Sequence, residues 1–124
     1  MKKISNYIAA VICIVILAGC DAAQKGAIQW AYSDIEKGKY ESALSNLSSA
    51  ESYKEPTPEL KAEILYLRAL CYGKLERYDE AIGVLMYIID KFPDSSYAYQ
   101  AKATLFRLKT STQKKYPPKE LNKI

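Results

Sequence analysis

The chain has 124 residues, of which 49% are hydrophobic, and a formal net charge of +4. This length allows one domain, and the absence of histidine removes the commonest general base and the commonest metal ligand. We therefore expect no enzymatic activity, no metal site and no bound cofactor. Positive charge is concentrated at the two ends, and residues 20–108 carry a net charge of about −2, which argues against a nucleic-acid partner.

The N-terminal segment has the features of an export signal. Lys2 and Lys3 provide a positive start, Ile8 to Ala18 is an uninterrupted apolar run, and the small residues Ala18 and Gly19 precede Cys20. The run of about eleven residues is short for a membrane-spanning helix, which needs about 20. We therefore predict that residues 1–19 are a cleaved signal peptide.

The segment ending in Leu17-Ala18-Gly19-Cys20 resembles the lipobox of bacterial lipoproteins. The resemblance implies that Cys20 carries a diacylglycerol and an acyl chain such as palmitate, with residues 20–25 as a lipidated tether. It also implies a periplasmic location, and Asp21 favours the inner membrane, with the outer membrane as the alternative. An ordinary secretory signal is the alternative to the lipoprotein prediction.

The three cysteines have separate interpretations. Cys13 would leave with the signal peptide, and Cys20 would be lipidated, so that Cys71 has no disulfide partner in the mature chain. Cys71 lies in a helical apolar pattern, where we predict a small buried thiol; a reactive thiol is the alternative.

From Ala27 onward apolar residues recur at helical spacing, and no alternating pattern indicates a strand, so we predict an all-α domain. Residues 38–44 and 76–82 are alike and lie 38 residues apart, which indicates a repeated helical hairpin. In a second copy, residues 62–95, one helix presents Leu65, Ala69 and Tyr72 to a second helix that presents Ala81, Leu85 and Ile88. Asp79 and Glu80 favour the start of that second helix, and Pro93 follows its end.

These positions resemble the tetratricopeptide repeat (TPR): Leu65 at the fourth position, Ala69 at the eighth, Tyr72 at the eleventh, Ala81 at the twentieth and Pro93 at the thirty-second. Arg68 departs from the pattern at the seventh position. The first copy, residues 24–57, matches the repeat pattern less well. It matches the pattern at Ala27, Trp30, Ala31, Tyr40, Ala43, Leu47 and Ala50, but has Asp34 where tyrosine is expected.

After the second copy we predict one capping helix. Thr57 and Pro58 make a good start for the third helix, and Asp94 or Ser95 can cap a fifth helix that runs to about Lys109. In that fifth helix we expect Tyr99, Ala103 and Phe106 to face inward. The predicted architecture is a short α-solenoid over residues 26–109, two TPR-like hairpins plus a cap, followed by a disordered basic tail at 110–124. An alternative role for the tail is contact with anionic lipid.

The resemblance implies that the concave face of the array binds a protein or peptide client. The residues that would point into this groove are Tyr32, Glu63, Tyr66, Leu70, Lys74, Tyr97, Gln100 and Arg107. For each tyrosine the alternative is half-buried packing, and for each cation it is solvated surface charge. Residues 92–101 also look like the joints between repeats in small envelope lipoproteins.

The predicted function is that of a membrane-anchored, non-enzymatic adaptor or assembly factor of the cell envelope. A self-associating subunit of an envelope, secretion or pilus complex is the alternative, because two repeats and a cap form a marginal array. A client, a second copy or the membrane would then supply the missing burial.

Overall fold

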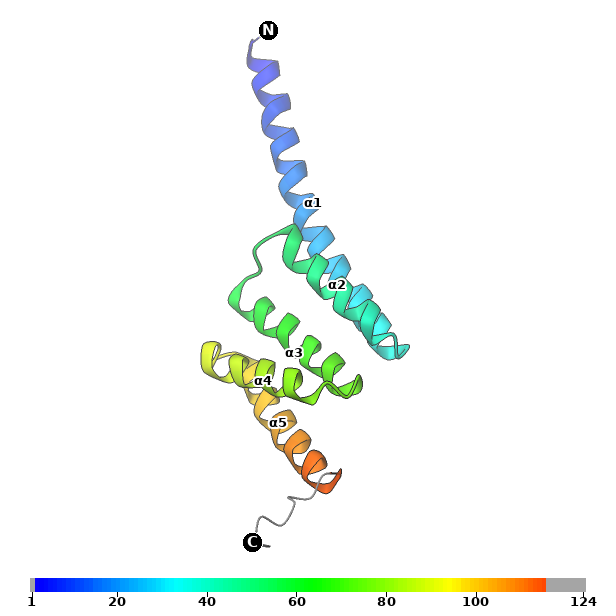
Figure 1. Ribbon diagram of the computed structural model, residues 1–124. Helices are drawn as coiled ribbons and strands as arrows, with labels where there is room; N and C mark the ends of the chain where they lie inside the picture. The colour runs from blue at the N-terminus through cyan, green and yellow to red at the C-terminus, as the bar shows by residue number, and fades with distance from the viewer. Residues whose placement is uncertain (1, 116–124) are drawn as a thin grey trace, which may run out of the picture. The chain divides into compact units, whose positions relative to one another are not determined.

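The computed structural model describes residues 2–115, and these form five α-helices and no strand. In chain order they are α1 (Lys2–Glu36), α2 (Tyr40–Tyr53), α3 (Pro58–Lys74), α4 (Tyr78–Lys91) and α5 (Ser96–Lys115), as Figure 1 shows. The chain divides into two compact units, residues 1–56 and 57–124. The predicted all-α class, with two helical hairpins and a further helix, is confirmed.

The first unit is the hairpin of α1 and α2. Gly38 occupies the left-handed region at φ +72°, and the Lys39 amide donates to the Asp34 carbonyl at 2.8 Å, which ends α1 and reverses the chain. Ala31 of α1 and Ala43 of α2 are fully buried, so the two helices can approach closely. Trp30, which the repeat pattern matched, is instead 65% exposed.

Asp34, the departure from the repeat pattern in the first copy, has a local explanation. One of its carboxylate oxygens accepts hydrogen bonds from Ser42 Oγ at 2.6 Å and from Asn46 Nδ2 at 2.9 Å. Asp34 therefore joins α1 to α2 by polar contacts where the usual tyrosine would do so by packing.

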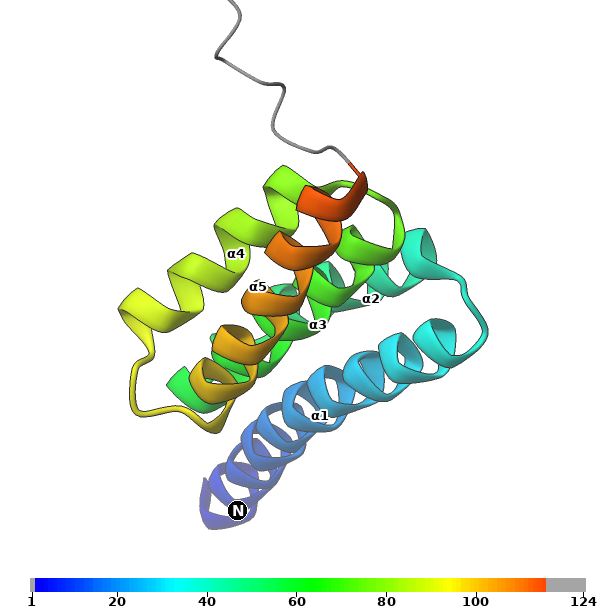
Figure 2. The same ribbon diagram turned by 90° about the horizontal axis from the view of Figure 1, so that it is seen from below.

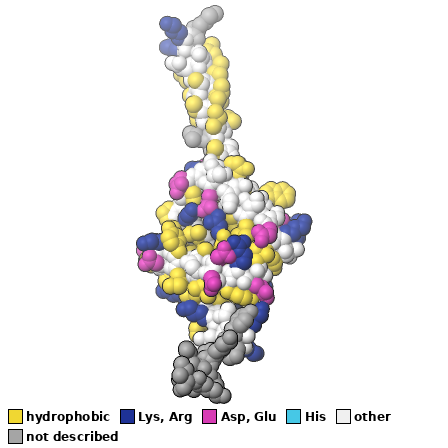
Figure 3. Space-filling model, in the orientation of Figure 1, with side chains coloured by type: hydrophobic (Ala, Val, Ile, Leu, Met, Phe, Trp, Pro, Cys, Tyr) yellow, Lys and Arg dark blue, Asp and Glu magenta, His cyan; other side chains and the backbone are white. Residues whose placement is uncertain are grey.

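The N-terminal part of α1 is apolar and exposed. Described side chains from residue 2 to residue 16 are exposed, and Figure 3 shows the hydrophobic ones along this part of the helix. By length and composition α1 could cross a membrane, a property that signal sequences share. The expected tether at residues 20–25 differs from the structure: it lies within α1, and Gln24 in it is 4% exposed.

The second unit contains α3, α4 and α5. Thr57 caps α3 by accepting a hydrogen bond from the Leu60 amide at 3.3 Å, and Pro58 occupies the first turn, as predicted. Ser95 accepts from the Tyr97 amide at 3.1 Å at the start of α5, also as predicted. Between α3 and α4, Glu76 takes a left-handed conformation at φ 60°, at the position that corresponds to Gly38 in the first hairpin.

The core of the second unit consists of small and branched apolar residues on three helices: Ala62, Leu65, Ala69, Leu85, Ile88, Ala98 and Ala101. Alanine lies at each close approach, and the larger residues fill the space beside it. Figure 2 shows α5 running beside α4, and α5 also contacts α3. Ala81 and Cys71 are also fully buried, and the predicted small buried thiol is therefore confirmed.

The predicted inward face of α5 is wrong. Ala98, Ala101 and Thr104 are the buried residues of this helix, whereas Tyr99 is 79% and Phe106 is 74% exposed, and Ala103 is exposed. The physical reason is that α5 has no second helix of its own among the described residues. It packs on α3 and α4 with the opposite face, and the positions that would receive a following helix remain open.

Helix α5 is also longer than the predicted end near Lys109. Thr110, Ser111 and Thr112 lie in this extension, and each donates a hydroxyl hydrogen bond to the carbonyl four residues earlier, at 2.9 Å. Lys115 in the last turn pairs with Glu76 at 3.2 Å. Residues 110–115 of the expected tail are therefore helical, and residues 116–124 lie outside the described residues.

Candidate functional site: a groove between α3 and α5

An open pocket of about 320 Å³ lies between α3 and α5 in the second unit. Three of the predicted groove residues, Leu70, Lys74 and Arg107, line it. The other lining residues are Ala69, Gly73, Tyr78, Thr104, Leu108 and Ser111. The pocket thus forms where the first helix of one repeat meets the corresponding helix of the next, on the side that the repeat pattern indicates.

Thr104 organises the polar part of this groove from an almost fully buried position, at 7% exposure. Its hydroxyl lies 3.1 Å from the Tyr66 hydroxyl and accepts a hydrogen bond from Arg107 Nη2 at 3.2 Å. The contact with Tyr66 joins α3 to α5, and the contact with Arg107 holds one end of that side chain. The groove is therefore supported by its own side chains rather than by loops.

Tyr66 and Tyr97, two of the predicted groove residues, do not line the pocket and instead pack against each other. Their ring centroids lie 5.7 Å apart at an interplanar angle of 43°, and both rings are half-buried against the core of the second unit. A pair of this kind contributes about 0.5–1.5 kcal/mol beyond its area burial. Both tyrosines are half-buried, as the packing alternative expects, so substituting alanine at Tyr66 should lower stability as well as alter the surface.

The electrostatic character of the groove comes from two cations. Lys74, in the last turn of α3, and Arg107, in α5, are both exposed and are the charged residues that line the pocket. Leu70 and Leu108 are half-buried and provide apolar surface beside them. The site therefore combines apolar contact area with two positive charges.

The remaining predicted groove residues are placed differently. Glu63 is half-buried and Gln100 is exposed, and neither lines the pocket. Tyr32 is half-buried in the first unit, whereas the pocket belongs to the second unit.

Sequence reasoning missed several lining residues for which a signal existed. Gly73, Thr104 and Leu108 occupy the twelfth, ninth and thirteenth positions of their repeats, the same positions from which the other groove residues were chosen. The Gly73 backbone approaches α5 without crowding, because a Cβ atom added there would lie 3.7 Å from Leu108 Cδ2. Tyr78 and Ser111 lie outside those positions, and only the packing of α4 and α5 brings them to the pocket.

A second open pocket, of about 460 Å³, lies at the joint between α4 and α5 and is lined in part by Thr57, Glu59, Phe92 and Ser95. Ser96 Oγ donates a hydrogen bond to Glu59 Oε1 at 2.8 Å. This bond, with a further one from Ser95, holds the pKa of Glu59 below its ordinary value. These contacts tie the start of α3 to the start of α5, so we assign this joint a structural role.

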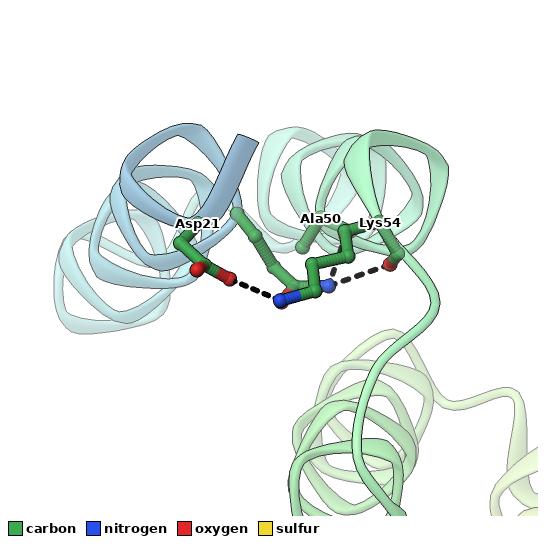
Figure 4. A network of polar contacts seen from close by, with 4 residues as sticks. Asp21, Ala50 and Lys54 are labelled. Atoms are coloured by element: carbon green, nitrogen blue, oxygen red, sulfur yellow. Dashed lines mark hydrogen bonds and ion pairs between the residues drawn. The ribbon is translucent and has the colours of Figure 1, made fainter. Parts of the chain in front are cut away.

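In the first unit, a polar network lies one residue after Cys20 (Figure 4). Lys54 Nζ contacts Asp21 Oδ1 at 2.6 Å, and Gln24 Nε2 donates to the carbonyl oxygens of Ala50 at 3.0 Å and Lys54 at 2.7 Å. Gln24 thereby satisfies two carbonyl groups at the end of α2. The predicted lipid-attachment residue, Cys20, directly precedes Asp21 in the chain and is half-exposed.

A scan against protein-family models matches residues 63–95 to the tetratricopeptide repeat. The chain contains a tetratricopeptide repeat. The match coincides with the second copy found from the sequence, whose two helices are α3 and α4. TPR modules are in general non-enzymatic and bind proteins, and no enzyme family is indicated. No curated protein and no solved structure matches the chain.

Proposed function

We propose that this TPR protein is a lipid-anchored adaptor or assembly factor of the bacterial cell envelope, which binds a client peptide or helix in the groove between α3 and α5. The observation that carries the proposal is the open pocket lined by Leu70, Lys74 and Arg107 at repeat positions that face the concave side. Apolar surface supplies contact area, and the two cations supply orientation. Because no acidic residue lines the pocket, the groove favours a client segment that carries carboxylates.

The burial pattern of α1 supports an anchor at Cys20. Among the described side chains of α1, the buried ones begin at Gln24 and follow Cys20, whereas those of residues 2–16 are exposed. Cleavage before Cys20 would therefore keep the buried part of the α1–α2 hairpin and the Asp21–Lys54 pair intact. Acyl chains on Cys20 would anchor the product, since each buried methylene contributes about 0.8 kcal/mol.

By its resemblance to bacterial lipoproteins, the anchored protein faces the periplasm, and Asp21 favours the inner membrane over the outer membrane. Mass spectrometry of the N-terminal peptide tests the anchor directly: we expect an acylated peptide that begins at Cys20. The Cys20→Ser variant should yield no acylated N-terminal peptide. A chain that retains residues 1–19 and no acyl group would contradict the anchor.

The groove is tested by crosslinking and affinity capture from native membranes with tagged full-length protein. A Leu70→Ala, Lys74→Glu double variant changes two lining residues outside the fully buried core, so helicity by circular dichroism should remain. We expect a client captured by the wild type to be lost in this variant. The matched control is Met86→Ala, Lys91→Glu, which makes the same classes of change at exposed positions outside the groove.

Equal client capture by the groove variant and the control would contradict the proposed groove. Capture of only further copies of the same chain would favour the self-associating subunit instead. Sedimentation velocity of the purified protein separates these results, because a self-associating subunit forms oligomers without any client.

A further inference from the structure

The outer face of α5 carries a stripe of apolar residues at helical spacing. Tyr99, Ala103 and Phe106 follow one another at intervals of four and three residues, and all three are exposed. The residues 34 positions earlier in the chain are Leu65, Ala69 and Tyr72, which share a face of α3.

The two faces differ in what covers them. In α3, Leu65 is 8% and Ala69 is 1% exposed, because α4 packs on this face with Leu85 and Ile88 in the shared core. In α5 the corresponding Tyr99 is 79% exposed and Phe106 is 74% exposed. Helix α5 therefore repeats the surface that receives α4, and no described helix of the second unit fills the equivalent place.

The charge of α5 indicates what kind of helix would pack on this exposed face. Helix α5 contains five basic residues and no acidic residue. At about 100° per residue, Lys102 and Lys109 flank the apolar stripe on one side, and Arg107 and Lys114 flank it on the other. A second α5 on this face would bring like charges together, which disfavours a second copy.

We propose that the outer face of α5 docks an amphipathic helix of a partner protein, with acidic residues on both sides of its apolar stripe. The stripe would have a small residue followed by two larger ones, the spacing of Ala81, Leu85 and Ile88 in α4. The small residue allows close approach to Ala103, and the acidic flanks meet the lysines of α5. The apolar stripe does not line the groove between α3 and α5, with which this surface shares only the flanking Arg107, and docking here does not depend on a client in the groove.

The test uses two synthetic helical peptides of about 18 residues, a length at which helix formers give appreciable helicity. Both carry the small-large-large apolar stripe; one has glutamates at the flanking positions and the other has lysines. Fluorescence anisotropy measures their binding to the full chain in detergent. We expect saturable binding of the acidic peptide and at least about tenfold weaker binding of the basic one.

Substitution of the stripe supplies the specific control. A Tyr99→Ser, Phe106→Ser variant should bind the acidic peptide with an affinity roughly 30-fold lower, as expected for the loss of aromatic anchors at an interface. Trp30→Ser removes an aromatic residue that is 65% exposed elsewhere and should leave the affinity unchanged. Leu70→Ala, Lys74→Glu should also leave it unchanged, which separates this surface from the groove.

Several results would overturn the proposal. One is the absence of saturable binding of the acidic peptide up to about 1 mM; another is equal binding of the two peptides. A dimer in sedimentation velocity that dissociates in the Tyr99→Ser, Phe106→Ser variant would assign the face to a second copy. Binding of the Cys20→Ser chain to vesicles with about 30% anionic lipid, lost in the same stripe variant, would assign it to the membrane.

Discussion

Leu85→Ala should remove most of the stability of the second unit. Leu85 lies on α4 with 0% exposure, and it contacts the core formed by α3, α4 and α5. The alanines around it, such as Ala69 and Ala98, are short and cannot extend into the space that the leucine vacates. The loss of transfer free energy and the residual cavity together cost about 3–5 kcal/mol at such a site.

That cost is large relative to the free energy of unfolding of the whole second unit. A unit of about 60 residues has a free energy of unfolding of about 3–9 kcal/mol at typical values per residue. We therefore expect the Leu85→Ala chain to show a much lower urea midpoint, followed by circular dichroism at 222 nm. The neighbouring Met86 is 54% exposed, so Met86→Ala is the matched control and should cost under about 1 kcal/mol.

A loss below about 1 kcal/mol for Leu85→Ala, or equal losses for the two variants, would refute the packing of α4 described above. The m-value provides a further check, because it should stay constant if only the native state is destabilised.

Three further predictions concern single contacts. Gln24→Ala leaves two carbonyl groups at the end of α2 without their donor and should cost about 1–3 kcal/mol in urea unfolding, whereas Gln29→Ala, at an exposed position, should change little. Glu76→Gly should raise the urea midpoint, because the left-handed conformation at this position costs a non-glycine residue about 1 kcal/mol. A lower urea midpoint would show that the lost ion pair between Glu76 and Lys115 outweighs this gain. Because the pKa of Glu59 is lowered in the folded state, this residue stabilises the fold at pH values above its ordinary pKa, and that stability is lost as pH falls through the folded-state pKa. Glu59→Gln should therefore flatten the acid side of the plot of unfolding free energy against pH, and Ser96→Ala should flatten it in part. An unchanged plot for both variants would contradict the contact.

Much of the candidate site could be predicted from repeat positions. Leu70, Lys74 and Arg107 were chosen because they stand at positions that face the concave side, and they line one pocket in the structure. The period of the repeat fixes which side of each helix faces inward, since residues three and four apart share a face. Tyr66 was placed on the same side, but the sequence could not show that its ring packs on Tyr97 and its hydroxyl contacts Thr104.

The error in α5 shows where repeat logic fails. Tyr99 corresponds to the buried Leu65 and Phe106 to the half-buried Tyr72 of the complete repeat, and both are exposed because no described helix follows to cover them. Burial depends on the neighbouring element as well as on the residue, and the N-terminal Gln24 illustrates the converse. A polar residue in an expected tether is buried because the end of α2 presents two carbonyl groups to it.

The sequence by itself determined the helical class, the hairpin period, the cap at Thr57 and the small buried residues of the second copy, because these follow from local backbone chemistry and from spacing along one helix. It narrowed the cap of α5 to Asp94 or Ser95, and the structure shows Ser95. Only the tertiary structure decided which face of α5 is buried, how Thr104 links Tyr66 to Arg107, and how Asp34 replaces a packing residue. These features arise between helices that are distant in sequence, where the geometry of the partner helix sets the outcome.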